Sequence, residues 1–327
     1  MRCVYLVNGK IVIKDVEIPK LEDGDILIKV KYALTDGTDL KTYLRGHHII
    51  KDGPFGHEYS GIVVESRSEK FKVGDEVFGL NSAYCGNCKY CKESRENLCI
   101  SLKFLFGAYA EYLKIPKEIV NKNVFIKPKE ISFKVAPIIE PLSCVFNGIE
   151  KLNLKGNENI LILGSGSIAI MFFLALSENH NVKIHSRSKD RLKLIKDKLL
   201  YEQIEKSFMK EYKDFDYSIV IDTTASFDLV NEILKNPRRG SKILLFSGME
   251  SEKFLTFEQS YFHYNEIDII TSFHHKPTST KKAYEYLRRN HMILENIITT
   301  EVELSDIEKA FFLMKERKAL KVAISVL

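Results

Sequence analysis

The sequence predicts an α/β protein with a β-rich first domain and a second domain built on a doubly wound parallel sheet. In the first half of the chain, short β-branched runs are separated by Gly, Pro and Asp, a pattern typical of strands. From about residue 145 onward, short apolar strands alternate with helical stretches, as in a parallel sheet covered by helices on both faces. The 327 residues suit two domains, and an apolar fraction of 45% suffices for a large core.

The β-rich domain is expected to comprise residues 1–145 together with the C-terminal segment 279–327. The C-terminal segment has the pattern helix, helix, strand, and we expect it to return to the first domain. The strand-like runs of the first part are 11–19, 25–34, 59–66 and 76–80.

The second domain is expected to comprise residues 146–278. Helical stretches at 167–179 and 188–200 separate its first three strands, which gives the rhythm of a parallel sheet. The strand-like runs are 159–164, 181–186, 217–224, 241–248 and 267–273.

Charge and hydropathy limit the kinds of partner that the chain can have. The net charge of +5 is spread along the whole chain, with no basic arm, so we expect no nucleic-acid partner. The N-terminus alternates like a strand and carries charge, so it does not resemble a signal peptide. The longest apolar run, 168–176, is too short to cross a bilayer. We therefore expect a cytoplasmic protein that has no membrane partner and acts on a small molecule.

A glycine-rich turn between a strand and a helix predicts a nucleotide site. After the strand NILIL, Gly164 allows a tight turn and Gly166 lets the backbone approach a pyrophosphate, while Ala169 packs helix on strand. Ser167 and Ile168 begin the helix, whose free N–H groups and dipole favour the anion. A tight turn in another kind of parallel sheet is the alternative.

The end of the next strand indicates which nicotinamide cofactor is bound. An NAD enzyme has an acidic residue there for the ribose 2′-hydroxyl, but this chain has Ser186 followed by Arg187. Serine can hydrogen-bond a 2′-phosphate, and Arg187, with Arg191 nearby, can pair with it. We therefore expect NADP, with NAD possible. The alternative is that these basic residues and Lys189 only solvate the following helix.

Four cysteines lie close together in the sequence and predict a structural zinc site. Cys85, Cys88, Cys91 and Cys99 have the spacing C-x2-C-x2-C-x7-C. Four thiolates in one loop form a closed tetrahedral zinc site that leaves no position for substrate. An iron–sulfur cluster is the alternative, and a disulfide framework is not expected in the cytosol.

A second group of possible metal ligands is weak when each residue is taken alone. His57 and Glu58 stand at the start of a strand, and Glu140 precedes a helix. Together with their surroundings, however, the chain resembles the zinc-containing medium-chain dehydrogenases of alcohols, polyols, sugars and threonine, among them the glucose and sorbitol dehydrogenases. The segments that carry the resemblance follow in family order, with the four-cysteine lobe after the third of them: DGTDLKTYLRG, GPFGHEYSGIV, FKVGDEVFG, GAYAEYLKIP, EPLSCVFNGI, GSGSIA, VIDTT, RRGSKILLFSG and IEKAFFLMKERKALKVAISV.

The resemblance implies a GroES-like catalytic domain and a Rossmann cofactor domain. It implies a catalytic zinc held by Asp36, His57 and Glu140, with Glu58 as a fourth ligand that alternates with water or substrate. A carboxylate at Glu140 resembles the polyol and sugar branch. Relatives of this kind are homodimers or homotetramers. A zinc-free NADPH-dependent quinone or enone reductase of the same fold is the alternative function, and a nucleic-acid-binding zinc module is the alternative outside enzymes.

One residue of this implied site departs from the family pattern. Family members usually have cysteine where this chain has Asp36, although Gly37, Thr38 and Asp39 follow as the pattern requires. Carboxylate oxygen coordinates zinc at ~2.0–2.2 Å and thiolate at ~2.3 Å. Oxygen is also the harder donor, so we expect weaker zinc binding and greater tolerance of Mn²⁺ or Co²⁺.

The resemblance also implies how hydride and proton would move. The zinc would act as a Lewis acid, and the hydroxyl-bearing carbon would pass hydride to the nicotinamide. Thr38 would hydrogen-bond the substrate oxygen and open a proton path, whereas Asp39 would hold structure by hydrogen bonding. Lys41 stands where the family often has a relay histidine. His47 or His48 could serve as the relay instead.

Overall fold

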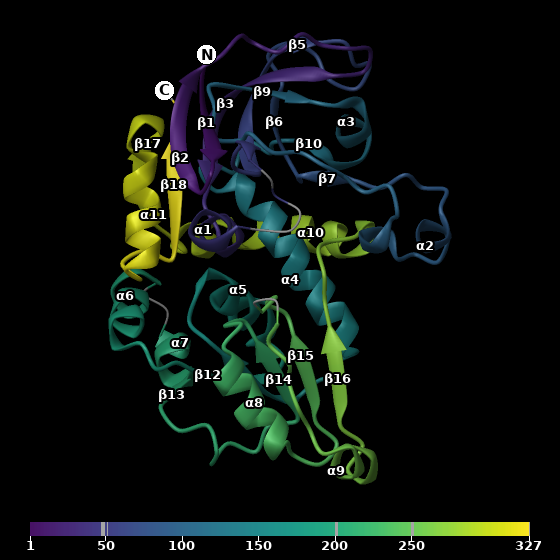
Figure 1. Ribbon diagram of the computed structural model, residues 1–327, viewed down its shortest axis with the longest axis vertical. Helices are drawn as coiled ribbons and strands as arrows, with labels where there is room; N and C mark the ends of the chain where they lie inside the picture. The colour runs from purple at the N-terminus through teal and green to yellow at the C-terminus, as the bar shows by residue number, and fades with distance from the viewer. Residues whose placement is uncertain (47–49, 51, 200–201, 250–251, 327) are drawn as a thin grey trace. The chain divides into compact units, whose positions relative to one another are not determined.

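The computed structural model describes residues 1–46, 50, 52–199, 202–249 and 252–326 (Figure 1). The chain divides into two compact units. Unit 1 contains Met1–Glu140 and Tyr284–Leu327, and unit 2 contains Pro141–Ala283. Unit 1 is β-rich and unit 2 holds a parallel sheet, so the expected α/β fold class is confirmed. The unit boundaries fall at 140/141 and 283/284, against 145/146 and 278/279 in the division expected from the sequence.

The main sheet of unit 1 brings the C-terminus of the chain beside its first ligand-bearing segments. Strand β3 (Ile26–Leu34) pairs with β5 (Glu58–Ser66) on one side and with β18 (Lys321–Ser325) on the other, both antiparallel. All five residues of β18 are buried. The sheet order is β10-β6-β5-β3-β18-β17, with β9 also paired to β3. The remaining strands are β6 (Glu76–Gly79), β9 (Tyr112–Ile115), β10 (Val124–Ile126) and β17 (Ile298–Glu303).

Two smaller sheets complete the strands of unit 1. Strands β1 (Arg2–Val7) and β2 (Lys10–Asp15) form a hairpin, and β1 also pairs with β4 (Gly53–Pro54). Asn8 and Gly9 form the hairpin turn, with φ of 50° and 72°. Asn-Gly suits this turn because both of its central residues need positive φ. Strands β7 (Ser82–Ala83) and β8 (Lys103–Phe104) pair beside the four-cysteine lobe.

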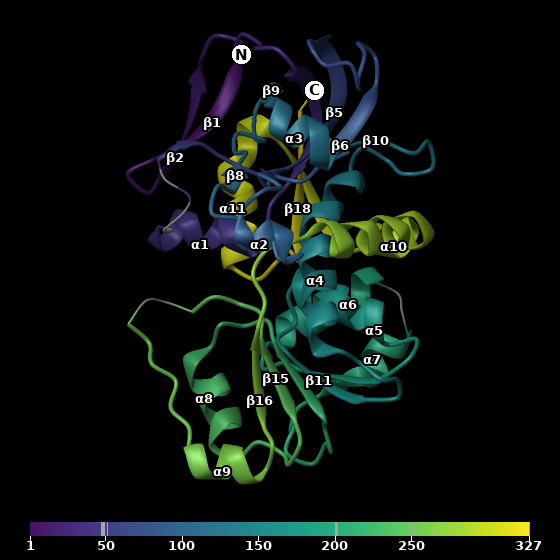
Figure 2. The same cartoon turned by 90° about the vertical axis from the view of Figure 1, so that its right-hand side faces the viewer.

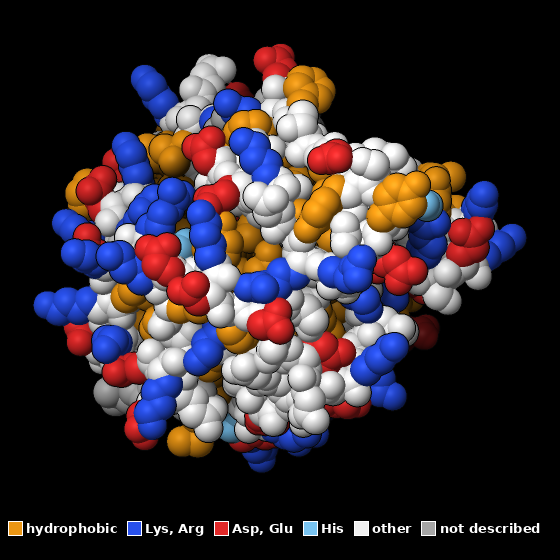
Figure 3. Space-filling model, turned by 90° about the horizontal axis from the view of Figure 1, so that it is seen from below, with side chains coloured by type: hydrophobic (Ala, Val, Ile, Leu, Met, Phe, Trp, Pro, Cys, Tyr) orange, Lys and Arg blue, Asp and Glu red, His pale blue; other side chains and the backbone are white. Residues whose placement is uncertain are grey.

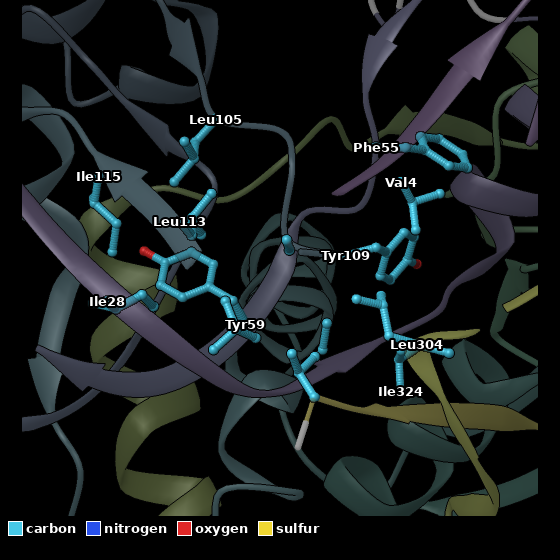
Figure 4. Packing of buried hydrophobic residues seen from close by; sticks show 14 of the residues in the cluster. Val4, Ile28, Phe55, Tyr59, Leu105, Tyr109, Leu113, Ile115, Leu304 and Ile324 are labelled. Atoms are coloured by element: carbon cyan, nitrogen blue, oxygen red, sulfur yellow. The ribbon is translucent and has the colours of Figure 1, made fainter. Parts of the chain in front are cut away.

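The helices of unit 1 flank these sheets, and large aromatic side chains fill the core between them. Figure 4 shows Tyr59, Tyr109 and Phe55 among the buried aliphatic residues of this core. Helix α1 begins directly after the first expected ligand. The helices are α1 (Gly37–Arg45), α2 (Lys89–Lys92), α3 (Lys117–Asn123) and α11 (Ile307–Lys315). Two further helices, α4 (Ile139–Leu152) and α10 (Pro277–Glu295), contain residues of both units.

Unit 2 contains a six-stranded parallel sheet in the order β13-β12-β11-β14-β15-β16. Figure 2 labels β11, β15 and β16 of this sheet. The chain starts at β11, winds outward through β12 to β13, and returns to build β14 to β16 on the other side. Ligands of such sheets bind at the carboxyl ends of the strands where this reversal occurs. The strands are β11 (Asn159–Leu163), β12 (Asn181–His185), β13 (Phe208–Met209), β14 (Ile219–Asp222), β15 (Lys242–Leu245) and β16 (Asp268–Thr271). The helices are α5 (Ser167–Leu176), α6 (Lys189–Leu199), α7 (Glu202–Ser207), α8 (Phe227–Lys235) and α9 (Gln259–Tyr264).

The surface agrees with the mild net charge of the sequence. On the face shown in Figure 3, Lys and Arg side chains are interspersed with Asp and Glu. Of the helices that the structure describes, none combines the length and the apolar character needed to cross a membrane.

A glycine in β5 gives a test of the main sheet. A Cβ on Gly61 would collide with the carbonyl oxygen of Lys29 and lie 3.1 Å from the Cα of Val30, both in the neighbouring β3. We expect Gly61→Ala to lower the free energy of unfolding by about 1–3 kcal/mol, because the backbone of β3 must move. Chemical denaturation followed by circular dichroism measures this. The matched control is Gly37→Ala, since a Cβ there meets open space. Equal unfolding midpoints in the two variants would contradict this account.

Candidate active site

Asp36 has two roles at the start of α1, because its two carboxylate oxygens face different neighbours. Its Oδ1 accepts hydrogen bonds from the backbone N–H groups of Thr38 (2.7 Å) and Asp39 (2.9 Å), so it caps the helix. The Asp39 carboxylate accepts in return from the Asp36 N–H at 3.1 Å. This reciprocal capping satisfies N–H groups that a helix start otherwise leaves unpaired. The second oxygen of Asp36, Oδ2, lies on the side of His57.

His57 presents one ring nitrogen to a cluster of carboxylates. Its Nδ1 lies 3.1 Å from Asp39 Oδ1. A carboxylate only accepts hydrogen bonds, so Nδ1 carries the proton of this pair and Nε2 is left as a possible ligand atom. Nε2 lies 3.9 Å from Asp36 Oδ2 and 4.0 Å from Glu140 Oε2. These distances are too long for hydrogen bonds.

Glu58, the next residue, is completely buried and paired with an equally buried lysine. Lys321 Nζ donates to Glu58 Oε1 at 2.6 Å and to the carbonyl oxygen of Thr35 at 2.9 Å, and both side chains of the ion pair are 0% exposed. The other oxygen, Glu58 Oε2, is also buried but has no hydrogen-bond partner among the described residues. A buried carboxylate oxygen without a donor is costly, so this atom indicates a missing partner.

Together these side chains have the composition and spacing of a divalent-metal site. The ligand atoms of Asp36, His57 and Glu58 all lie within 4.8 Å of one another. Ligands bound at ~2.0–2.2 Å in a tetrahedron lie about 3.4 Å apart. The distances from His57 Nε2 to Asp36 Oδ2 and Glu140 Oε2, 3.9 Å and 4.0 Å, exceed this spacing by only about half an ångström. Glu140, the second residue of α4, belongs to unit 1 like the other three. The oxygen and nitrogen donors fit zinc.

The pKa shifts of the cluster fit a site for a cation. Burial raises the pKa of Glu140, and burial together with the nearby Asp36 keeps the pKa of Glu58 well above its usual range despite Lys321. Burial opposes the charge on His57, but the carboxylates of Asp39 and Asp36 outweigh it and raise its pKa well above usual. The upward shifts of Glu58 and Glu140 show that further negative charge is disfavoured in this cluster, and a bound divalent cation would offset it.

The four-cysteine lobe has the geometry of a second, closed site. The sulfur atoms of Cys85, Cys88, Cys91 and Cys99 all lie within 4.8 Å of one another, and Cys88 Sγ lies 3.5 Å from Cys91 Sγ. Four thiolates bound at ~2.3 Å in a tetrahedron lie about 3.8 Å apart. Hydrogen bonds from the backbone lower the pKa of Cys88 to about 6, so its thiolate forms readily. None of the six cysteines, all of which the structure describes, forms a disulfide, and this agrees with a metal site in the lobe.

In unit 2 the glycine-rich turn follows β11 at the carboxyl edge of the sheet. Gly164 has φ of 109°, and a Cβ on it would lie 2.7 Å from Thr223 Oγ1, so only glycine fits without strain. Gly166 caps α5, and a Cβ there would meet open space. Ser167 and Ile168 form the first turn of α5. The N-terminus of α5 therefore has the form expected for a pyrophosphate site.

The residues expected at the cofactor ribose lie at the end of β12 and the start of α6. The Ser186 hydroxyl lies 2.7 Å from the Ser165 hydroxyl, which joins the end of β12 to the glycine-rich turn. Arg187 is exposed, and Arg191 is half-buried in the first turn of α6. Ser165 was not expected as part of this region. Its place inside the G-x-G turn is the signal that could have indicated it.

Further residues around the cluster of possible metal ligands were not predicted from the sequence. Lys321 pairs with Glu58, and Tyr109 donates to Asp39 at 2.6 Å. A lysine within the apolar run ALKVAISVL could have suggested a buried charge, but nothing near it in the sequence indicates which carboxylate it pairs with. Lys41 lies within α1, and His47 and His48 fall outside the described residues.

Comparison with known proteins agrees with this architecture. The family described as "Alcohol dehydrogenase GroES-like domain" matches residues 22–125. A sorbitol dehydrogenase of Bacillus subtilis is 27% identical over 99% of this chain and 97% of its own length. A D-arabitol-phosphate dehydrogenase of Enterococcus avium is 28% identical over 95% of this chain and 92% of its own length. An L-threonine 3-dehydrogenase of Bacillus velezensis is also 28% identical, over 95% and 94%.

Solved structures share the fold over the whole chain. An alcohol dehydrogenase from Thermus sp. ATN1 has a TM-score of 0.87 and 21% identity, covering all of both chains. A 2R,3R-butanediol dehydrogenase from Bacillus subtilis has a TM-score of 0.84 and 20% identity, covering 99% of each. At 20–21% identity these structures show the fold, and the sorbitol, arabitol-phosphate and threonine dehydrogenases to which the sequence is similar support an alcohol or polyol dehydrogenase.

Proposed function

We propose that this protein is a zinc-dependent dehydrogenase that moves hydride between an alcohol, polyol or sugar and NADP, with NAD as the less favoured cofactor. One observation carries the proposal most directly. Asp36, His57 and Glu58 converge on a buried point, and one oxygen of Glu58 lacks a hydrogen-bond partner among the described residues. The relatives named sorbitol and D-arabitol-phosphate dehydrogenase support a polyol as substrate.

The proposed zinc ligands are Asp36 Oδ2, His57 Nε2 and a carboxylate oxygen of Glu140. Glu58 Oε2 is the fourth, exchangeable ligand. Its other oxygen is held by Lys321, so the carboxylate can offer Oε2 without leaving its place in the sheet. Zinc in such a site supplies Lewis-acid chemistry to a substrate hydroxyl, while the nicotinamide exchanges the hydride.

Thr38 is the proposed group for the substrate proton. It lies two residues after Asp36 in the first turn of α1 and is half-buried, so it is close to the proposed metal without being sealed from solvent. A hydroxyl both donates and accepts, so Thr38 can take a hydrogen bond from the substrate and pass the proton outward. Asp39 is occupied by His57 and Tyr109, which suits a structural task.

Cofactor binding is proposed at Gly164, Gly166, Ser167 and Ile168 for the pyrophosphate. Ser186, Arg187 and Arg191 are proposed for the 2′-phosphate of NADP. Support comes from the sequence GSGSIA at the start of α5 and from the absence of an acidic side chain in the stretch HSRS at the end of β12. Arginine pairs well with phosphate because its donors are planar and permanently charged.

The four cysteines are proposed to hold the second, structural zinc. A closed tetrahedral site would tie down a lobe whose regular structure is limited to short elements such as α2. Assembly as a homodimer or homotetramer and a cytoplasmic location stay predictions.

The first test is a metal count. We expect the purified protein to contain two zinc ions per chain, one at the cluster of Asp36, His57 and Glu58 and one at the four cysteines. We expect His57→Ala to retain only the lobe zinc and to lose dehydrogenase activity. Elemental analysis and a panel of alcohols, polyols and sugars with NADP measure both. A single zinc per parent chain would favour the alternative function, a reductase that has no catalytic zinc. Full activity in a metal-stripped His57→Ala protein would falsify the mechanism.

Substitution of Asp36 separates helix capping from metal binding. Asn caps helices about as well as Asp, so Asp36→Asn should leave the unfolding midpoint of the metal-free protein unchanged. It should weaken zinc binding at least roughly 10-fold, about 1.4 kcal/mol, because the anionic oxygen is lost. Asp36→Ala should lose the cap as well, at about 1 kcal/mol of stability. Competition with a chelator measures the affinity. An unchanged zinc affinity in Asp36→Asn would remove Asp36 from the ligand set.

The cofactor preference is tested at Arg187. We expect Arg187→Ala to raise KM for NADP by roughly 10–100-fold, as loss of a hydrogen bond to a charged group implies, while KM for NAD changes little. Steady-state kinetics with both cofactors measure this. Lys189→Ala, two residues away at the start of α6, is the matched control for a general loss of positive charge. Equal use of NADP and NAD by the parent enzyme would argue against the proposed preference.

A further inference from the structure

We propose that Tyr109 is a positioning residue of the metal site: its hydroxyl holds the Asp39 carboxylate, and Asp39 in turn orients His57 and the loop of Asp36. This inference rests on the proposed function, since it concerns the same metal site. It adds a residue that touches neither the metal nor the substrate and lies in a different segment of the chain from every proposed ligand.

The backbone of Tyr109 is fixed on both sides. Its N–H donates to the carbonyl oxygen of Phe55 at 3.1 Å, and its carbonyl oxygen accepts from the N–H of Val4 at 2.9 Å. Phe55 lies two residues before His57. The segment that carries Tyr109 is therefore attached directly to the loop that carries the histidine.

The ring of Tyr109 is seated against the residue that precedes His57. Gly56 has φ of 88°, and a Cβ on it would lie 2.6 Å from the Tyr109 ring, so the ring packs directly on the backbone of Gly56. Phe55 and Phe311 meet the same ring edge-on, at centroid distances of 5.8 Å and 6.3 Å. Figure 4 shows Tyr109 beside Phe55 and Val4 in this core. The ring is 0% exposed and has little freedom to turn.

The packing of the ring therefore fixes the position of the Tyr109 hydroxyl, which lies beside the Asp39 carboxylate. It lies 2.6 Å from Asp39 Oδ2 and 3.1 Å from the carbonyl oxygen of Leu34. Both neighbours are acceptors, and the single proton favours the charged one, because hydrogen bonds to carboxylates are shorter and stronger. Burial and the Asp39 carboxylate keep the pKa of Tyr109 well above its usual range, so the phenol remains a donor.

Asp39 links this hydroxyl to two of the proposed ligands. Its Oδ2 accepts from Tyr109 and from the N–H of Asp36, while its Oδ1 faces His57 Nδ1. The Asp39 side chain is fully buried, so no bulk water can replace a lost donor. Without the hydroxyl, the carboxylate is free to turn toward its remaining donors, and the direction of His57 Nε2 changes with it. Groups that orient a metal-binding histidine affect metal affinity strongly.

Tyr109→Phe tests the proposal, because it removes the hydroxyl and keeps the ring packed on Gly56. We expect zinc binding at the catalytic site to weaken about 10-fold, with the lobe zinc unaffected. We also expect the visible absorption bands of Co²⁺ in the catalytic site to shift, since the histidine ligand changes its orientation. With saturating zinc, kcat should recover most of the parent value, since no group that touches the substrate is lost.

Tyr59→Phe is the matched control. Tyr59 is equally buried in the same core, but its hydroxyl points to the carbonyl oxygen of Leu80 at 3.5 Å. We expect this variant to bind zinc like the parent. A loss of zinc affinity in Tyr59→Phe equal to that in Tyr109→Phe would overturn the proposal, because general loosening of the core would then explain both.

A double-mutant comparison shows whether Tyr109 acts through Asp39. In an Asp39→Ala background, Tyr109→Phe should have little further effect on zinc affinity, because position 39 then has no oxygen that could accept a hydrogen bond from the Tyr109 hydroxyl. Full additivity of the two losses would overturn the proposal, as would an unchanged zinc affinity and Co²⁺ spectrum in Tyr109→Phe alone. If the parent binds only the lobe zinc, the proposed function fails first and this inference fails with it. If the parent binds both zinc ions and Tyr109→Phe matches it, this inference alone fails.

Discussion

The buried ion pair between Lys321 and Glu58 is the interaction on which the proposed metal site depends. It joins the last strand of the chain, β18, to the first residue of β5, 263 positions away. A buried ammonium is tolerated only when its donors are satisfied, and Glu58 Oε1 and the carbonyl oxygen of Thr35 do this for Lys321. Thr35 in turn precedes Asp36. One lysine therefore connects the two ligand-bearing segments of the N-terminal part of the chain to its C-terminus, and removing either partner of the pair would leave a buried charge, at about 3–5 kcal/mol.

The same cluster explains how aspartate can replace the usual cysteine. Thiolate and carboxylate carry the same charge, so the balance among Asp36, Glu58, Glu140 and Lys321 is kept when the donor changes from sulfur to oxygen. What changes is the second task of the side chain. A carboxylate has two oxygens, and in Asp36 one caps α1 while the other faces His57. Sulfur is a weak acceptor that caps poorly. In the proposed site, aspartate would therefore bind a soft metal less tightly than cysteine, while its other oxygen caps the start of α1.

Much of this could be predicted from the sequence where the determining residues are neighbours. The turn at Gly164 follows from a strand, two glycines and a helix start, whereas His57 and Glu58 were indicated as ligands only by the resemblance of the surrounding segments to the dehydrogenase family. Contacts between distant residues could not be predicted in the same way. Tyr109 and Asp39 are 70 positions apart, and no periodic pattern connects them. The capping role of Asp36 was not predicted, because the sequence DGTD was interpreted only as a ligand loop, and the structure combines the two roles.

The division of the chain into two units separates metal chemistry from cofactor chemistry. Every proposed ligand of the catalytic zinc lies in unit 1, with Glu140 as the last residue of its first segment, and every proposed cofactor contact lies in unit 2. Asp39, Tyr109 and Lys321 also belong to unit 1. The hydrogen bonds and the ion pair described above among these residues thus lie within unit 1. Zinc affinity and the Co²⁺ spectrum should then respond to Asp36 and Tyr109 in the absence of cofactor, whereas substitution of Arg187 should leave both unchanged.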